Sequence, residues 1–206
     1  MKGAVIAVAH ATLLAAPIAL VGRARALLEP HALACLFLLV LLSIVEGRLA
    51  APEAMRRSAR VGTVLAFASS LSLLTMAWCS IGSRSPAASG LGVVPLAAGI
   101  ALRARSLRDL GPFFTSGIEP AADRLVVQGI YARLRHPSEA GLLLCGAGVV
   151  LFGGSVVGLL IFAVVMLPSI LLRVIAEDRA LSAQFGTVHA RYQQRVGGLF
   201  PRWERG

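Results

Sequence analysis

A run of 32 residues without a charged side chain, residues 141–172, limits the possible folds of this chain more than any other sequence feature. As a single α-helix this run would be about 48 Å long, whereas the hydrocarbon core of a bilayer is about 30 Å thick. Two shorter helices that turn at Gly153-Gly154 fit better, because adjacent glycines favour a turn. We therefore predict helical segments at residues 138–152 and 155–172 of an integral membrane protein.

The composition agrees with a membrane protein. Hydrophobic residues make up 57% of the chain and charged residues only 15%, whereas a soluble domain has about 25% charged residues. This apolar content also excludes intrinsic disorder. The net charge is +10, but the basic residues lie at the ends of apolar runs and not on one soluble face. We therefore expect contacts with anionic membrane lipids and no nucleic-acid partner.

Four further apolar runs, at residues 4–21, 31–45, 61–81 and 91–102, predict additional spans. The fourth run is short, and Pro86 is an alternative start for its helix. The expected fold class is all-α: a polytopic helical membrane protein of about five to six transmembrane segments, with a cytoplasmic C-terminal helical extension. We read the first run as a retained helix and not as a cleaved signal, because Arg25 occupies the middle of the candidate cleavage site at residues 24–26.

The distribution of basic residues predicts the orientation of a multi-pass protein. If the C-terminus is cytoplasmic, the outside loops hold only Arg23, Arg25 and Arg84, which leaves 17 of the 20 basic residues inside. Cytoplasmic loops of membrane proteins carry such an excess. Both termini are therefore predicted to lie in the cytoplasm. The sequence leaves the oligomeric state open.

Polar residues concentrate in two segments on the predicted cytoplasmic side, residues 103–137 and residues 173–206. We therefore divide the chain into an N-terminal membrane region of four segments, residues 1–102, and a region that carries the chemistry, residues 103–206. The three cysteines (Cys35, Cys79 and Cys145) are isolated in apolar runs and show no metal-ligand spacing, so no metal site is expected.

Each polar segment contains one pattern of interest. Arg135 and His136 precede Pro137, which is typical of the first turn of a helix, and a helix N-terminus favours anions. Arg173 and Glu177 are four residues apart and share one face of a helix. Taken singly, each pattern also fits ordinary contacts with headgroups or an ion pair at a membrane surface.

Together the two segments resemble the isoprenylcysteine carboxyl methyltransferases and their phospholipid-methylating relatives. The first segment has Gly129-x-Tyr131, Arg135-His136-Pro137-Ser138 and Gly141, similar to the family signature GxYxxxRHPSYxG. The second has Arg173, Glu177-Asp178, Leu181, Phe185-Gly186, His189 and Tyr192, similar to RxxxEExxLxxxFGxxYxxY. The resemblance covers about residues 103–201, and the motifs occur in the family's order.

The resemblance implies an enzyme that uses S-adenosylmethionine to methylate a lipophilic small molecule or a lipidated substrate. It implies that Arg173 faces the acceptor, and an amine acceptor would make Asp178 a candidate base, with Glu139 and His189 as alternatives. The residues that we expect at the cofactor are Asp123, Arg124, Leu125, Val126, Tyr131, Arg135, His136, Pro137, Ser138, Glu139 and Glu177.

The chain departs from the family pattern at three positions. Asp178 replaces a glutamate, whereas Glu139 and His189 replace tyrosines. Three roles are open for Glu139: it favours the helix dipole, it pairs with Arg135, or it marks a different acceptor. Two other functions also remain open, a membrane-embedded nicotinamide-dependent reductase of related C-terminal architecture and a non-enzymatic membrane protein with a decayed cofactor pocket.

Overall fold

The computed structural model describes residues 86–111 and 125–202, together with isolated helical positions within residues 37–44 and 68–75. In these ranges the secondary structure is helical, which confirms the predicted all-α class for this part of the chain. The elements are α4 (Pro86–Leu110), the 3-10 helix η3 (Gly129–Ala132), α5 (Pro137–Gly153), α6 (Val156–Ile161), the π-helical turn η4 (Phe162–Met166), α7 (Leu167–Phe185) and α8 (Thr187–Arg195).

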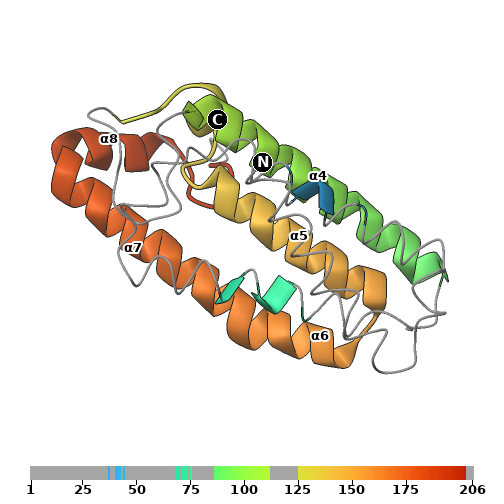
Figure 1. Ribbon diagram of the computed structural model, residues 1–206. Helices are drawn as coiled ribbons and strands as arrows, with labels where there is room; N and C mark the ends of the chain where they lie inside the picture. Colours follow the sequence, from blue (N-terminus) through green and yellow to red (C-terminus); the bar gives the residue numbers. More distant parts are fainter. Residues whose placement is uncertain are drawn as a thin grey trace.

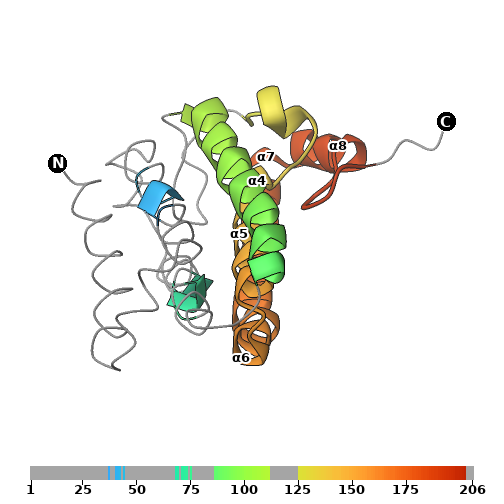
Figure 2. The ribbon, with the colours of Figure 1, turned by 90° about the vertical axis from the view of Figure 1, so that its right-hand side faces the viewer.

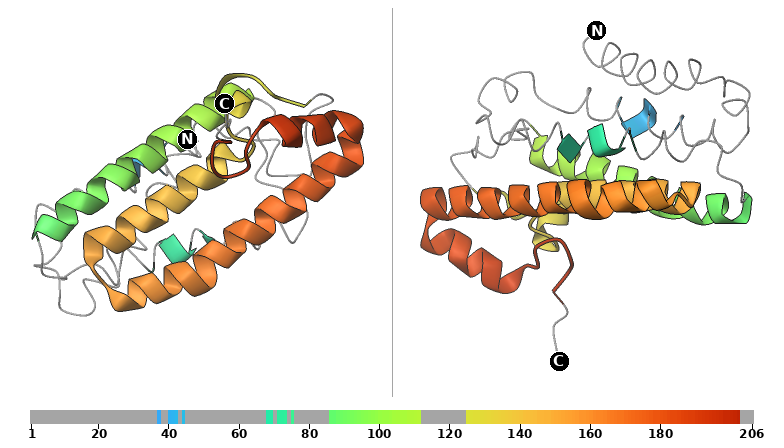
Figure 3. Two further views of the ribbon diagram at one scale, coloured as in Figure 1. Left: turned by 180° about the vertical axis from the view of Figure 1, so that it is seen from behind. Right: turned by 90° about the horizontal axis from the view of Figure 1, so that it is seen from below.

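The long helices form one layer. Helix α5 lies between α4 on one side and the continuous helix α6–η4–α7 on the other (Figures 1 and 3). Helix α8 turns back out of this layer at Gly186 (Figure 2), whose φ of 51° is a left-handed value that favours glycine. The fold therefore brings α8 and the residues after it toward the loop that precedes α5.

The predicted turn between the last two apolar segments is confirmed. Helix α5 ends at Gly153, and Gly154 follows with a φ of 55°, which glycine adopts without strain. The next helix begins at once, because the Ser155 hydroxyl caps it by accepting a hydrogen bond from the Gly158 N–H at 3.2 Å. It then continues without a break to Phe185, as expected for a segment that extends beyond the bilayer.

Two helices of the described part are long and apolar enough to cross a membrane, Gly90–Leu110 and Val156–Phe185. The total of five to six spans stays a prediction, because the first three predicted segments lie mostly outside the described residues. The fourth segment is a helix from Pro86 to Leu110, so the alternative start near Pro86 is confirmed, whereas the predicted end at residue 102 is too early. The apolar run ends at the charged residue Arg103. The helix continues because residues 103–110 contain no glycine or proline, and it ends before Gly111. The predicted boundary at residue 102 thus falls inside α4.

Glycines bring the backbones of α4 and α5 into direct contact. A Cβ atom at Gly141 would lie 2.8 Å from the Gly99 carbonyl oxygen, and one at Gly148 would lie 2.6 Å from the Leu96 nitrogen. Side chains at these positions would therefore force the two helices apart. The glycines at positions 141 and 148 therefore allow close helix packing.

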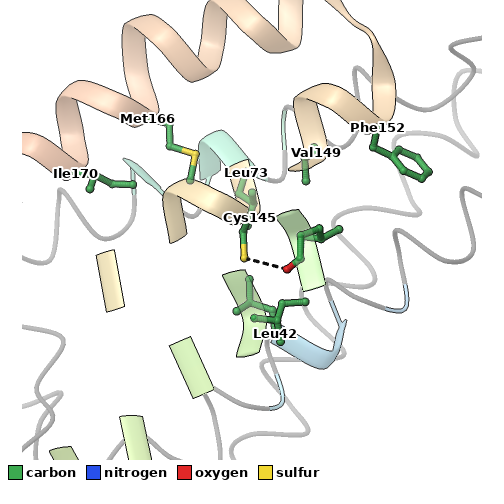
Figure 4. Close-up of a cluster of buried hydrophobic side chains, with 9 residues drawn as sticks. Leu42, Leu73, Cys145, Val149, Phe152, Met166 and Ile170 are labelled. Atoms are coloured by element: carbon green, nitrogen blue, oxygen red, sulfur yellow. Dashed lines mark hydrogen bonds between the residues drawn. The ribbon is translucent and has the colours of Figure 1, made fainter. Parts of the chain in front are cut away.

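Around this contact lies a core of buried apolar side chains from α4, α5 and α6–η4–α7, joined by Leu42 and Leu73 (Figure 4). Cys145 is fully buried within it, with its Sγ 3.8 Å from the Leu96 carbonyl oxygen, as expected for a small hydrophobic residue. The other two cysteines, Cys35 and Cys79, lie outside the described residues.

The opposite face of α6–η4–α7 exposes large apolar side chains, among them Val156, Leu160, Val164 and Leu172. This face suits contact with lipid.

Candidate functional site

The loop before α5 is held against the segment that follows α8. Leu134 and Gly197 form an isolated parallel bridge, in which the Arg135 N–H donates to the Gly197 carbonyl at 2.8 Å. The His136 N–H donates to the Gly198 carbonyl at 3.2 Å. The Tyr192 hydroxyl donates to the Tyr131 carbonyl at 2.6 Å. These bonds join the two sequence motifs at one end of the helical layer.

Asp178, on α7, receives donors from the loop before α5. The Arg135 Nη1 lies 2.8 Å from Oδ1 and 2.6 Å from Oδ2 of Asp178. The His136 Nε2 lies 3.0 Å from the same Oδ1, and the His189 Nε2 approaches it to 3.5 Å from α8. Asp178 thus ties three separate segments together through one carboxylate.

A second ion pair joins the first turn of α5 to α7. The Arg173 Nε donates to the Glu139 Oε1 at 3.1 Å, and the two residues are 9% and 7% exposed, so the pair is buried. Next to it, the Arg103 Nη1 of α4 donates to the Ser138 hydroxyl oxygen at 2.8 Å. Helices α4, α5 and α7 therefore all contribute polar groups at this end of the layer.

Glu177 is the carboxylate of this region with the greatest capacity for a ligand. Its Oε2 lies 3.5 Å from the Nδ1 of His136, a long contact that leaves most of its acceptor capacity unused within the described ranges. Its side chain is 32% exposed, whereas His136 is 1% exposed. The buried Nδ1 atom of His136 has no hydrogen-bond partner there. A buried polar atom of this kind indicates a missing partner.

We call Arg135, His136, Glu139, Arg173, Glu177 and Asp178 the ionic cluster. His136 carries a charge in it: burial alone would lower its pKa, but the hydrogen bond to Asp178 and the nearby carboxylate of Glu177 outweigh burial and raise the pKa to about 10. At neutral pH the cluster therefore contains three cations and three carboxylates, and Arg103 lies beside it as a further cation.

His136, Glu139 and Glu177 each place one ligand-type atom within 4.8 Å of the others, close enough to share a cation. However, Glu139 is bound to Arg173 and His136 is protonated at neutral pH, and a protonated imidazole nitrogen has no lone pair for a metal. The three groups are better described as a charge network than as a metal-ligand set.

Two neighbouring groups stay neutral. Burial lowers the pKa of His189, whose Nδ1 lies 2.9 Å from the Ser182 hydroxyl oxygen, and the nearby cations Arg135 and His136 act in the same direction. Burial also raises the pKa of the Tyr131 hydroxyl well above its ordinary value, so the phenol remains protonated. These groups can donate hydrogen bonds to a ligand without adding charge.

The structure brings together most of the residues that the sequence singled out. The six members of the ionic cluster are joined by the contacts above, Pro137 is the first residue of α5, and Ser138 is bound by Arg103. Tyr131 is buried beside them through its bond from Tyr192. Leu125 and Val126 are half-buried at the start of their described segment. Asp123 and Arg124 lie outside the described residues.

One suggested pairing is wrong. Glu139 does not pair with Arg135, because Arg135 is bound to Asp178 and Glu139 to Arg173. The sequence did not show these partners, because residues 135 and 139 are four apart and would share a face if both lay on one helix. Helix α5 begins only at Pro137, however, so Arg135 lies in the loop and points to α7.

Sequence reasoning missed two contributors. Arg103 looked like a cation at the end of a membrane span, and only the approach of α4 to α5 shows that it binds Ser138. Ser182 carried no signal because it occupies an unspecified position of the second motif, yet it contacts His189. His189 itself was visible in the sequence as a departure from the family tyrosine.

The fold and the site together define a class of protein: a helical membrane protein with a polar, charged site at one end of an apolar layer. A family model for phospholipid methyltransferases matches residues 88–188, which include the whole ionic cluster. A protein-S-isoprenylcysteine O-methyltransferase from Schizosaccharomyces pombe is 32% identical over 77 residues, which are 37% of this chain and 33% of the relative. Protein-S-isoprenylcysteine O-methyltransferase B from Arabidopsis thaliana is 30% identical over 116 residues, 55% of this chain and 59% of the relative.

Over residues 88–188 the chain therefore matches the phospholipid methyltransferase family model and is similar to isoprenylcysteine methyltransferases, which confirms the resemblance found in the motifs. The match spans 33% and 59% of the lengths of the two relatives.

Proposed function

We propose that this protein transfers the methyl group of S-adenosylmethionine to a lipophilic acceptor, a carboxylate or an amine, at the boundary between membrane and cytosol. The observation that carries the proposal is the meeting of the two motifs at His136 and Glu177, where a buried imidazole nitrogen and a half-exposed carboxylate face each other at 3.5 Å. The match to the phospholipid methyltransferase model also supports it.

The residues fit such a cofactor. S-adenosylmethionine carries an ammonium group, a sulfonium group, ribose hydroxyls and a carboxylate. Glu177 has free acceptor capacity for the ammonium or the hydroxyls, and protonated His136 is a donor for an anionic group. Bound there, the cofactor supplies a methyl group on a sulfonium, which is already activated for displacement.

The protein's own contribution is then mostly positioning. The acceptor and the methyl donor must approach in line, and a bound near-attack geometry replaces a bimolecular encounter. The apolar faces of the spanning helices suit a lipophilic acceptor, whereas the ionic cluster suits a water-soluble cofactor. Asp178 is held by Arg135 and His136, which favours an orienting role over that of a base.

Binding of S-adenosylhomocysteine, the demethylated cofactor, tests the proposal in purified protein. We expect Glu177→Ala and His136→Ala each to weaken binding at least tenfold, about 1.4 kcal/mol, because each removes one of the facing groups. Arg179→Ala is the matched control, since Arg179 is an exposed cation on the same helix.

A parallel titration with a reduced nicotinamide cofactor separates the proposal from a membrane reductase. If the folded protein does not bind S-adenosylhomocysteine at millimolar concentration, the proposal is contradicted. Unchanged affinity in both variants would contradict the assignment of the site.

A further inference from the structure

We propose that Glu139 determines acceptor specificity: by holding Arg173 it excludes anionic acceptors and reserves the site for an uncharged protic nucleophile, an amine or a thiol on an apolar chain. This inference rests on the proposed methyl transfer, and it narrows the acceptor class. The relatives are named as O-methyltransferases. This chain has a carboxylate, Glu139, at the position where the family signature has tyrosine.

The first argument is that the positive charge of Arg173 is already paired with the carboxylate of Glu139. Arg173 is the cation expected to face the acceptor, and its Nε donates to the Glu139 Oε1 at 3.1 Å in a buried pair. Removing one partner from a buried ion pair is strongly destabilising, because it leaves an uncompensated buried charge. A carboxylate acceptor would have to compete with Glu139 for the guanidinium.

The second argument is that the other cations of the ionic cluster are also held by its own carboxylates. Arg135 places one nitrogen within 2.8 Å of both oxygens of Asp178, and His136 lies between Asp178 and Glu177. The neighbouring Arg103 is bonded to Ser138. A carboxylate acceptor would have to bind beside Glu139 and Asp178, which already hold Arg173 and Arg135. Like charges brought together in this way disfavour binding.

An uncharged amine or thiol avoids this repulsion. Its lone pair forms the new bond to the methyl carbon while the carbon–sulfur bond breaks and its electron pair remains on sulfur. The acceptor then loses its proton to water beside Glu177, the half-exposed carboxylate of the cluster. A carboxylate acceptor would release no proton, so the two classes differ in both charge and products.

The chemical stability of the transferred methyl group tests the inference even while the natural acceptor is unidentified. Purified protein is incubated with tritiated S-adenosylmethionine and a membrane lipid extract, and the labelled lipids are treated with mild alkali. Methyl esters release volatile labelled methanol, whereas N-methyl and S-methyl groups do not. A matched pair of probes, S-farnesylcysteamine and N-acetyl-S-farnesylcysteine, presents an amine or a carboxylate on the same apolar chain.

We expect the label transferred by the unaltered protein to be stable to alkali. Glu139→Gln keeps the size of the side chain and an acceptor oxygen for Arg173 but removes the negative charge. It should raise the share of alkali-labile product at least tenfold, together with the ratio of carboxylate to amine probe methylated. Arg179→Gln, which removes an exposed charge from the same helix as Arg173, should leave this ratio unchanged.

Alkali-labile product as the main product of the unaltered protein would overturn the inference, and so would an unchanged ratio in Glu139→Gln. S-adenosylhomocysteine binding is measured on the same samples. Absence of that binding would count against methyl transfer itself, whereas binding with ester formation would count only against the role of Glu139.

Discussion

At the scale of single residues, His136 links the two motifs. One ring nitrogen lies 3.0 Å from Asp178 and the other lies 3.5 Å from Glu177, while its backbone N–H bonds to Gly198. Its imidazole is almost completely buried, yet the two carboxylates hold it protonated. A histidine of this kind makes stability depend on pH.

We expect stability to fall as pH rises above about 6.5. The pKa of His136 is about 10 in the folded protein and 6.5 ordinarily, so its stabilisation is complete below pH 6.5 and is lost as pH rises through 10. Within this window the free energy of unfolding should fall by up to about 1.4 kcal/mol per pH unit. The melting temperature in detergent, measured from pH 6.5 to 9.5, tests this.

His136→Gln should flatten that pH dependence. His189→Gln is the matched control: burial lowers the pKa of His189, so its contribution changes only below pH 6.5 and the fall at higher pH should persist. Equal slopes in the unaltered protein and His136→Gln would show that His136 is not the titrating group.

At the scale of elements, the contact between α4 and α5 decides where the site lies. Direct backbone contact at Gly99–Gly141 and Leu96–Gly148 sets the separation of the helices. The Arg103 side chain reaches Ser138 only because α4 continues past this contact at close range. Small residues in the helix interface thus position polar groups at the end of the layer.

We expect Gly148→Ala to destabilise the protein by about 1–3 kcal/mol, because overpacking forces backbone shifts. The new Cβ would lie 2.6 Å from the Leu96 nitrogen, which is backbone and cannot rotate away. Gly90→Ala is the control in the same pair of helices, since nothing lies within 4 Å of its Cβ position. Alanine there should be neutral or slightly stabilising. Similar melting temperatures for both variants would refute the close contact.

At the scale of the whole molecule, the arrangement of charge implies a direction in the membrane. The ionic cluster and α8 lie at one end of the helical layer, and the turn at residues 153–155 lies at the other end (Figure 1). Basic residues gather at the cluster end, among them Arg133, Arg179, Arg191 and Arg195. The positive-inside rule therefore predicts a cytoplasmic site.

Cysteine labelling tests this orientation. In a variant in which Cys35, Cys79 and Cys145 are replaced by serine or alanine, single cysteines are placed at Ser155 and at Arg195. An impermeant maleimide added to sealed vesicles of known orientation should label position 155 from the outside and position 195 from the cytoplasmic side. Labelling of both positions from the same side would contradict a membrane-spanning α6–η4–α7.

The sequence alone was sufficient for local features. The length of the uncharged run at residues 141–172 predicted two helices, and the adjacent glycines predicted the turn at Gly153-Gly154. The order of the two motifs predicted the resemblance to the methyltransferase family. These features depend on neighbours in the chain, and patterns of neighbouring residues record them. The end of α4 was predicted wrongly, because a charged residue ends an apolar run without ending a helix.

Which charges pair with one another was decided only by the tertiary structure. Arg173 and Glu139 are 34 positions apart, and Arg135 and Asp178 are 43 positions apart. Motif spacing does not encode such partners, because they depend on the separation of helices and on the bridge between Leu134 and Gly197. The sequence thus determined which chemical groups the site contains. Packing between distant segments determined which of them are already neutralised and which remain available to a ligand, because charges pair by distance in space and not along the chain.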